Sequence, residues 1–140
     1  MQYWLVKSEP DVWSYDQQVK AGAKGEPWTG VRNHAAKLNM MKMKKGDRAF
    51  FYHSNIGKEI AGIVEIVREH YPDPEAAPGE PWVVVDVAAR QKMPEPVTLE
   101  AIKQEPKLKE MTLLKNSRLS VQPVTAAEWK LVCKMGGLKG

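Results

Sequence analysis

The chain has 140 residues, 43% of them apolar, which is enough for one domain with its own core. The formal net charge of +4 is mild and excludes neither a polyanionic partner nor an ordinary surface. The single cysteine, Cys133, excludes a disulfide framework within the chain and a cysteine-based zinc site. The three histidines, His34, His53 and His70, lack the close spacing of a metal motif, so we expect neither metal nor cofactor.

The N-terminal residues lead directly into a strand pattern and have no signal-peptide layout. No stretch approaches the ~18 apolar residues of a membrane span. We therefore expect a soluble intracellular protein without membrane contact, located in the cytoplasm or, in a eukaryote, in the nucleus.

The first elements are a strand and a short helix. Residues 3–7 are rich in β-formers, and Pro10, which cannot donate to a ladder, ends the pattern soon afterwards. Ser14 followed by Gln17 is a capping box, which predicts a helix that runs to about Lys20. Ser8 therefore stands at the end of the first strand.

A Gly- and Pro-rich segment at residues 25–30 indicates a loop. Because Trp28 lies in this loop, it is the tryptophan we expect to face a ligand. Asn33 fits the N-cap of a helix over residues 34–43, whose N-terminus would lie just after Trp28 and favour an anion or a base acceptor.

The remaining pattern predicts mostly antiparallel strands with small helices between them. A strand at 46–55 and a β-branched run at 59–68 form a hairpin, and a strand at 82–88 is limited by Pro94 and Pro96. Residues 98–111 predict one or two short helices, interrupted at Pro106. A short strand at 120–124, whose proline suggests an edge or a bulge, and a capped helix at 125–135 follow. This order predicts the α+β class, with a small barrel or strongly bent sheet and peripheral helices.

The stretch Gly46–Asn55 delivers polar groups to the rim of the core. A turn pair and an aromatic run are followed directly by His53, Ser54 and Asn55. Ligand pockets combine apolar walls with a few convergent polar groups, so we expect a pocket here. From Arg32 to Arg48 the chain carries a basic stretch, which fits either phosphate attraction or a solvated helix face.

These segments resemble the EVE domain family of the PUA-like superfamily, nearly from end to end and in its single-domain form. The likeness lies in Tyr3-Trp4-Leu5-Val6-Lys7-Ser8-Glu9-Pro10, in Trp28-Thr29-Gly30-Val31-Arg32-Asn33 and in Phe51-Tyr52-His53-Ser54-Asn55. The resemblance implies one domain over 1–140, a PUA-like bent sheet or pseudo-barrel of about five or six strands, and a non-catalytic role. It implies recognition of DNA or RNA through a pocket for one base, of the methylated or hydroxymethylated cytosine type.

The residue chemistry offers candidates for each task of a base reader. Stacking surfaces, base-edge donors and acceptors, and phosphate-binding cations are all needed. For the base-binding pocket we predict Ser8, Trp28, Asn33, Tyr52, His53, Ser54, Asn55, Tyr71, Ser120 and Gln122. For phosphate contacts we predict Lys7, Arg32, Lys37 and Arg118.

Strand alternation limits this set, because neighbours along a strand face opposite sides. We expect His53 or Ser54 in the pocket, but not both. Asn33 and Ser8 fit structural capping as well as base reading, and Gln122 favours a structural role. We also expect Trp28→Ala to abolish binding while the fold stays intact.

Two alternatives remain open. A hydrolase could use Ser8 with His53, although no nucleophile-elbow motif is present, and a protein-interaction module could use a hydrophobic groove. Besides nucleic acid we expect an effector protein as a partner, because the chain offers no second domain, and a monomer or a weak dimer.

Overall fold

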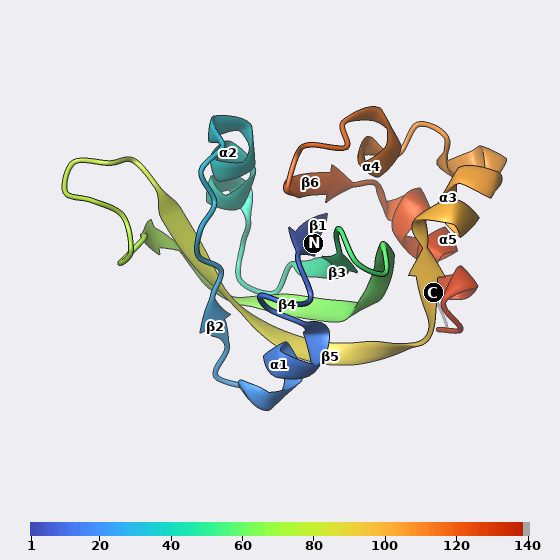
Figure 1. The fold of residues 1–140 in the computed structure, drawn as a ribbon, viewed down its shortest axis with the longest axis horizontal. Helices are drawn as coiled ribbons and strands as arrows, with labels where there is room; N and C mark the ends of the chain where they lie inside the picture. Colours follow the sequence, from blue (N-terminus) through green and yellow to red (C-terminus); the bar gives the residue numbers. More distant parts are fainter. Residues whose placement is uncertain (139–140) are drawn as a thin grey trace.

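The computed structural model describes residues 1–138, which form one six-stranded sheet in the order β2-β5-β4-β3-β1-β6 (Figure 1). The strands are β1 (Tyr3–Ser8), β2 (Glu26–Pro27), β3 (Arg48–His53), β4 (Glu59–Pro72), β5 (Val83–Thr98) and β6 (Val121–Val124). Every neighbouring pair is antiparallel except β1 and β3, which are parallel. The predicted α+β class, with a mostly antiparallel sheet and short helices, is confirmed.

The long connection between β1 and β3 explains their parallel pairing. Parallel strands need a crossover of a dozen or more residues. Here the crossover carries α1 (Tyr15–Lys20), β2 and α2 (His34–Lys42). Consequently the carboxyl ends of both strands lie at the same edge of the sheet, where Ser8 pairs with His53.

Alternation along these strands builds a separate core on each face of the sheet. Val6 and Phe51 belong to a first core, whereas Leu5 and Phe50 belong to a second. The first core is covered by α1 and α2. The second is covered by α3 (Leu99–Gln104), the 3₁₀ helix η1 (Pro106–Leu108), α4 (Thr112–Lys115) and α5 (Ala126–Met135), which gather at one side in Figure 1.

Several local predictions are confirmed. Both capping boxes are formed, Asn33 accepts a hydrogen bond from Ala36 N–H at 3.0 Å as the N-cap of α2, and β6 lies at an edge of the sheet. The expected end of the third strand is wrong, because β5 continues through Pro94 and Pro96. These prolines lie where the register between β4 and β5 shifts, and a proline is tolerated at such an irregularity because no ladder hydrogen bond is required there.

The packing of α1 depends on a glycine in β4. The Tyr15 hydroxyl donates to the Ile63 carbonyl at 2.9 Å, and its ring lies flat over the backbone of Gly62. A Cβ atom at Gly62 would come within 2.3 Å of that ring. Any side chain at this position would therefore displace α1.

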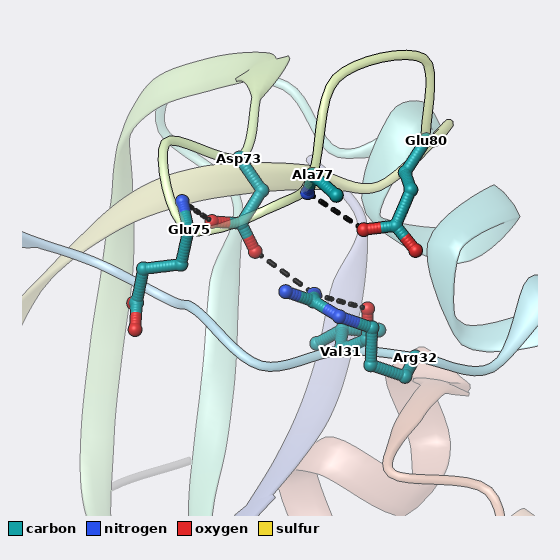
Figure 2. Close-up of polar contacts among 6 residues, drawn as sticks. All are labelled: Val31, Arg32, Asp73, Glu75, Ala77 and Glu80. Atoms are coloured by element: carbon teal, nitrogen blue, oxygen red, sulfur yellow. Dashed lines mark hydrogen bonds and ion pairs between the residues drawn. The ribbon is translucent and has the colours of Figure 1, made fainter.

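The loop that joins β4 to β5 is tied to the segment before α2 by a buried carboxylate, as Figure 2 shows. Asp73 accepts hydrogen bonds from Glu75 N–H at 2.7 Å and from Arg32 Nη1 at 3.0 Å. Burial raises the pKa of this carboxyl, but the hydrogen bonds from Glu75 and Arg32 and the charge of Arg32 outweigh burial and lower it overall. No helix within residues 1–138 is long and apolar enough to cross a membrane.

We predict that Asp73→Asn destabilises the fold by about 1–2 kcal/mol, because Arg32 loses its charged acceptor while solvent screens part of the pair. Since the folded pKa is lowered, the carboxylate stabilises the fold above its ordinary pKa of 3.8, and this contribution is lost as the pH falls through the folded value. Urea unfolding across acid pH should show this loss in the wild type but not in Asp73→Asn. The exposed Asp11→Asn is the matched control, and an equal acid loss in Asp73→Asn would contradict the assignment.

Candidate nucleic-acid interface

Two pockets lie where β1 and β3 end, one on each face of the sheet. The first, which we call the tryptophan pocket, has a volume of about 490 Å³ and is lined by Lys7, Ser8, Trp13, Glu26, Trp28 and Glu75 among others. The second, the basic pocket, has a volume of about 460 Å³ and is lined by Lys7, Tyr52, Ser54, Lys58, Arg118 and Ser120 among others. The predicted single pocket is therefore divided between the two faces, and among residues 1–138 only Lys7 lines both.

Trp13 forms a wall of the tryptophan pocket and is held at both its backbone and its ring. Ser8 Oγ donates to the Trp13 carbonyl at 2.6 Å. The indole Nε1 donates to Gln18 Oε1 at 2.9 Å, and Gln18, fully buried, donates in turn to the Val87 carbonyl at 3.0 Å. The half-buried ring is thus fixed in place before any ligand arrives.

Beneath Trp13, His53 fixes the start of α1. Its Nε2 accepts a hydrogen bond from Tyr15 N–H at 3.1 Å, which satisfies one of the free donors in the first turn of the helix. Burial lowers the pKa of His53, against the opposing effect of the Glu59 and Asp16 carboxylates. His53 therefore holds the start of α1, which follows Trp13, and itself lines neither pocket.

Trp28 lines the tryptophan pocket from within the first core. Its side chain is only 8% exposed, and its ring meets Phe51 edge-on, with the ring centroids 5.4 Å apart. This burial overturns the expectation that Trp28→Ala would leave the fold intact, because removing a buried tryptophan typically costs about 3–5 kcal/mol. Its neighbour Thr29 is exposed at the pocket mouth.

The two pockets differ in charge. In the tryptophan pocket, Lys7 is accompanied by the carboxylates Glu26 and Glu75. In the basic pocket, Lys7, Lys58 and Arg118 are accompanied by Glu9 alone. The first surrounds a ligand with acceptors and the second attracts anions.

Some predicted base-binding residues line the basic pocket, namely Tyr52, Ser54, Asn55 and Ser120, while Ser8 and Trp28 line the tryptophan pocket. Ser54, which directly follows β3, lines the basic pocket, whereas His53 lines neither pocket. Among the predicted phosphate contacts, Arg118 and Lys7 line the basic pocket.

The remaining predicted residues have structural partners or lie elsewhere. Gln122 is fully buried and donates to the carbonyls of Asn116 and Leu119. The Tyr71 hydroxyl donates to Asp86, and burial together with this carboxylate raises the Tyr71 pKa to about 12. Asn33 caps α2, Arg32 is paired with Asp73, and Lys37 on α2 lines neither pocket.

Trp13 is among the pocket residues that the sequence reasoning missed, together with Glu26, Glu75 and Lys58. Trp13 directly precedes the N-cap Ser14, and this is the position of the first residue of a hydrophobic staple. Its hydrogen-bond partner Gln18 occupies N4, the position of the second staple residue. A tryptophan between a strand end and a capping box is a signal that could have identified it.

We predict that replacing His53 removes a pH dependence of stability. Because the folded pKa is lowered, the neutral imidazole stabilises the fold above its ordinary value of 6.5, and this contribution is lost as the pH falls from there through the folded pKa. In His53→Gln, an amide oxygen can accept from Tyr15 N–H without titrating. Thermal unfolding from about pH 7.5 to about pH 5 should show a smaller decline in His53→Gln than in the exposed control His70→Gln. Equal declines would exclude His53 as the titrating group.

Known proteins share this fold. A structure from Rhodopseudomonas palustris is 67% identical with a TM-score of 0.92, covering 98% of this chain and 94% of that chain. Human THYN1, crystallised in complex with 5-methylcytosine-containing DNA, is 32% identical with a TM-score of 0.90, and the match covers 100% of this chain and 100% of that chain. A YTH domain of Zygosaccharomyces rouxii, 17% identical with a TM-score of 0.60 over 96% of this chain and 86% of that chain, shows the likeness of fold alone.

Sequence relatives agree with the structural ones. Mouse thymocyte nuclear protein 1 is 37% identical over 164 residues, which cover 95% of this chain and 73% of the mouse protein. The EVE domain matches residues 2–135. The chain therefore belongs to the EVE domain family.

Proposed function

We propose that the protein binds nucleic acid and accepts one modified cytosine, methylated or hydroxymethylated, in the tryptophan pocket. The proposal rests on the indole of Trp13, which hydrogen bonds already hold in place, and on the carboxylates Glu26 and Glu75 in the same pocket. The pocket volume of about 490 Å³ lies within the range of ligand pockets. The complex of human THYN1 with 5-methylcytosine-containing DNA supports the proposal and favours DNA as the polymer.

The lining groups match the edge of a cytosine. The exocyclic N4 amine of cytosine is a donor, and glutamate carboxylates are its usual acceptors, a task for Glu26 or Glu75. Thr29 supplies a donor for the ring acceptors. A methyl group at C5 would find apolar contact with Val12, Pro27 or Pro74, which complete the lining.

The energetics explain why one aromatic wall is insufficient. Stacking contributes about 1–3 kcal/mol per base, and extruding a base from a duplex costs a few kcal/mol. Stacking on Trp13 would therefore barely offset flipping. Edge hydrogen bonds and phosphate contacts must supply the net affinity.

We further propose that the role is binding and not catalysis. A hydrolase would need Ser8 as nucleophile and His53 as its base. Instead, Ser8 Oγ donates to the Trp13 carbonyl, and His53 Nε2 accepts from Tyr15 N–H. Both side chains thus serve to hold the segment that presents Trp13, which favours a reader.

We predict that Trp13→Ala weakens binding to an oligonucleotide carrying 5-methylcytosine by about ten- to a hundredfold, the loss expected for one stacking surface. Fluorescence anisotropy at low salt measures it, with an unmodified oligonucleotide of the same sequence to report base preference. Trp82→Ala is the matched control, because this half-buried tryptophan lines neither pocket.

Thermal unfolding of each variant separates lost binding from lost structure. Wild-type affinity in folded Trp13→Ala would exclude the tryptophan pocket as the base site. No binding of modified or unmodified oligonucleotides by the wild type at about 50 mM salt would rule out the nucleic-acid function itself.

A further inference from the structure

The basic pocket stands outside the function proposed so far. It opens at the same edge as the tryptophan pocket but on the other face of the sheet, where Tyr52 and Leu113 belong to the second core. Lys7 is the residue that the two pockets share. A polymer whose base entered the first pocket would therefore have the second within reach of its neighbouring backbone.

Its cations are not neutralised by the protein. In residues 1–138, none of Lys7, Lys58 and Arg118 is ion-paired with a carboxylate. The one lining carboxylate, Glu9, accepts a hydrogen bond from Asn55 Nδ2 at 3.3 Å. The pocket therefore holds an excess of positive charge, which favours an anionic ligand.

Lys7 is the most constrained of the three cations. Its ammonium donates to the Ser117 carbonyl at 2.5 Å and lies 5.9 Å from the centroid of the Tyr52 ring. Burial lowers the pKa of Lys7, because the protein's own contacts do not fully replace the water lost around the charged ammonium. An ammonium has three donors, and the Ser117 carbonyl engages one of them, which leaves others for a ligand oxygen.

The backbone at the pocket rim is strained. Asn55 and Lys58, with φ of 71° and 47°, are the non-glycine residues with positive φ among the described residues, and both line this pocket. Such conformations are uncommon for side-chain-bearing residues and cluster at ligand-binding sites. This conformation of the 54–58 turn places Lys58 at the pocket.

We propose that the basic pocket binds the phosphodiester backbone next to a base held in the tryptophan pocket, with Lys7, Lys58 and Arg118 as its cations. This inference rests on the proposed function, because it gives the nucleic acid a second point of attachment. The hydroxyls of Ser54, Ser117 and Ser120 provide further donors to phosphate oxygens. The contact positions the strand and carries no base preference of its own.

The test is the salt dependence of binding. The double variant Lys58→Asn and Arg118→Gln removes two exposed charges, and asparagine tolerates the left-handed backbone at position 58. Lys7 stays unchanged because it lines both pockets. We expect the slope of log affinity against log salt for a 5-methylcytosine oligonucleotide to become shallower by about 0.7–0.9 for each phosphate that the protein no longer neutralises.

The matched control removes two lysines from α5, Lys130→Gln and Lys134→Gln, which line neither pocket. This control should keep the wild-type slope. The basic-pocket variant should lose affinity for modified and unmodified oligonucleotides by the same factor. Trp13→Ala should show the opposite pattern, with no base preference and an unchanged slope.

These patterns separate the two proposals. A basic-pocket variant whose slope and affinity equal those of the control overturns the phosphate site while leaving the base pocket standing. If the basic-pocket variant has a shallower slope but the wild type shows no preference for the modified base, the phosphate site is supported and the base pocket is overturned. A wild type that binds no oligonucleotide overturns both.

Discussion

The parallel pairing of β1 with β3 is the constraint on which the candidate interface depends. It brings two strand ends, Ser8 and His53, side by side at one edge of the sheet. Both side chains then hold the segment between β1 and α1, through the Trp13 carbonyl and Tyr15 N–H. In an antiparallel pair the two carboxyl ends would lie at opposite edges, and this support for Trp13 would not exist.

The sheet also separates two kinds of chemistry. Because successive side chains face opposite sides, His53 points towards the first core while Tyr52 belongs to the second. The tryptophan pocket, rich in acceptors, therefore opens on one face and the basic pocket on the other. The carboxylates Glu26 and Glu75 thus lie on one face, and the cations Lys58 and Arg118 lie on the other.

Buried carboxylates hold the surrounding segments in place. Asp47 accepts hydrogen bonds from Gln2 N–H, Trp4 Nε1 and Lys44 N–H, which ties β1 to the turn before β3. Asp73 performs the same task for the β4–β5 loop, whose residues Pro74 and Glu75 form part of the tryptophan pocket. A buried carboxylate without hydrogen bonds would destabilise the fold. Each of these two therefore favours the loop conformation that brings its several donors within reach.

The helix starts and the family likeness could be predicted from the sequence alone. Capping boxes at Ser14 and Thr125 and the N-cap at Asn33 mark helix starts through hydrogen bonds within a few residues, and such signals are readable without a fold. Long motifs such as Tyr3–Pro10 identified the EVE resemblance. Alternation within β3 places Phe50 and Phe51 in different cores, because it depends only on strand geometry.

Which residues share a pocket depends on the fold as a whole. Trp28 lies in a Gly- and Pro-rich loop, yet packing on Phe51 buries it. The half-buried Trp13 forms a wall of the pocket instead, held by Gln18 and Ser8. Similarly, β5 passes through Pro94 because its register with β4 shifts at that point. Such outcomes depend on contacts between residues distant in sequence, and no local pattern encodes which partner each side chain meets.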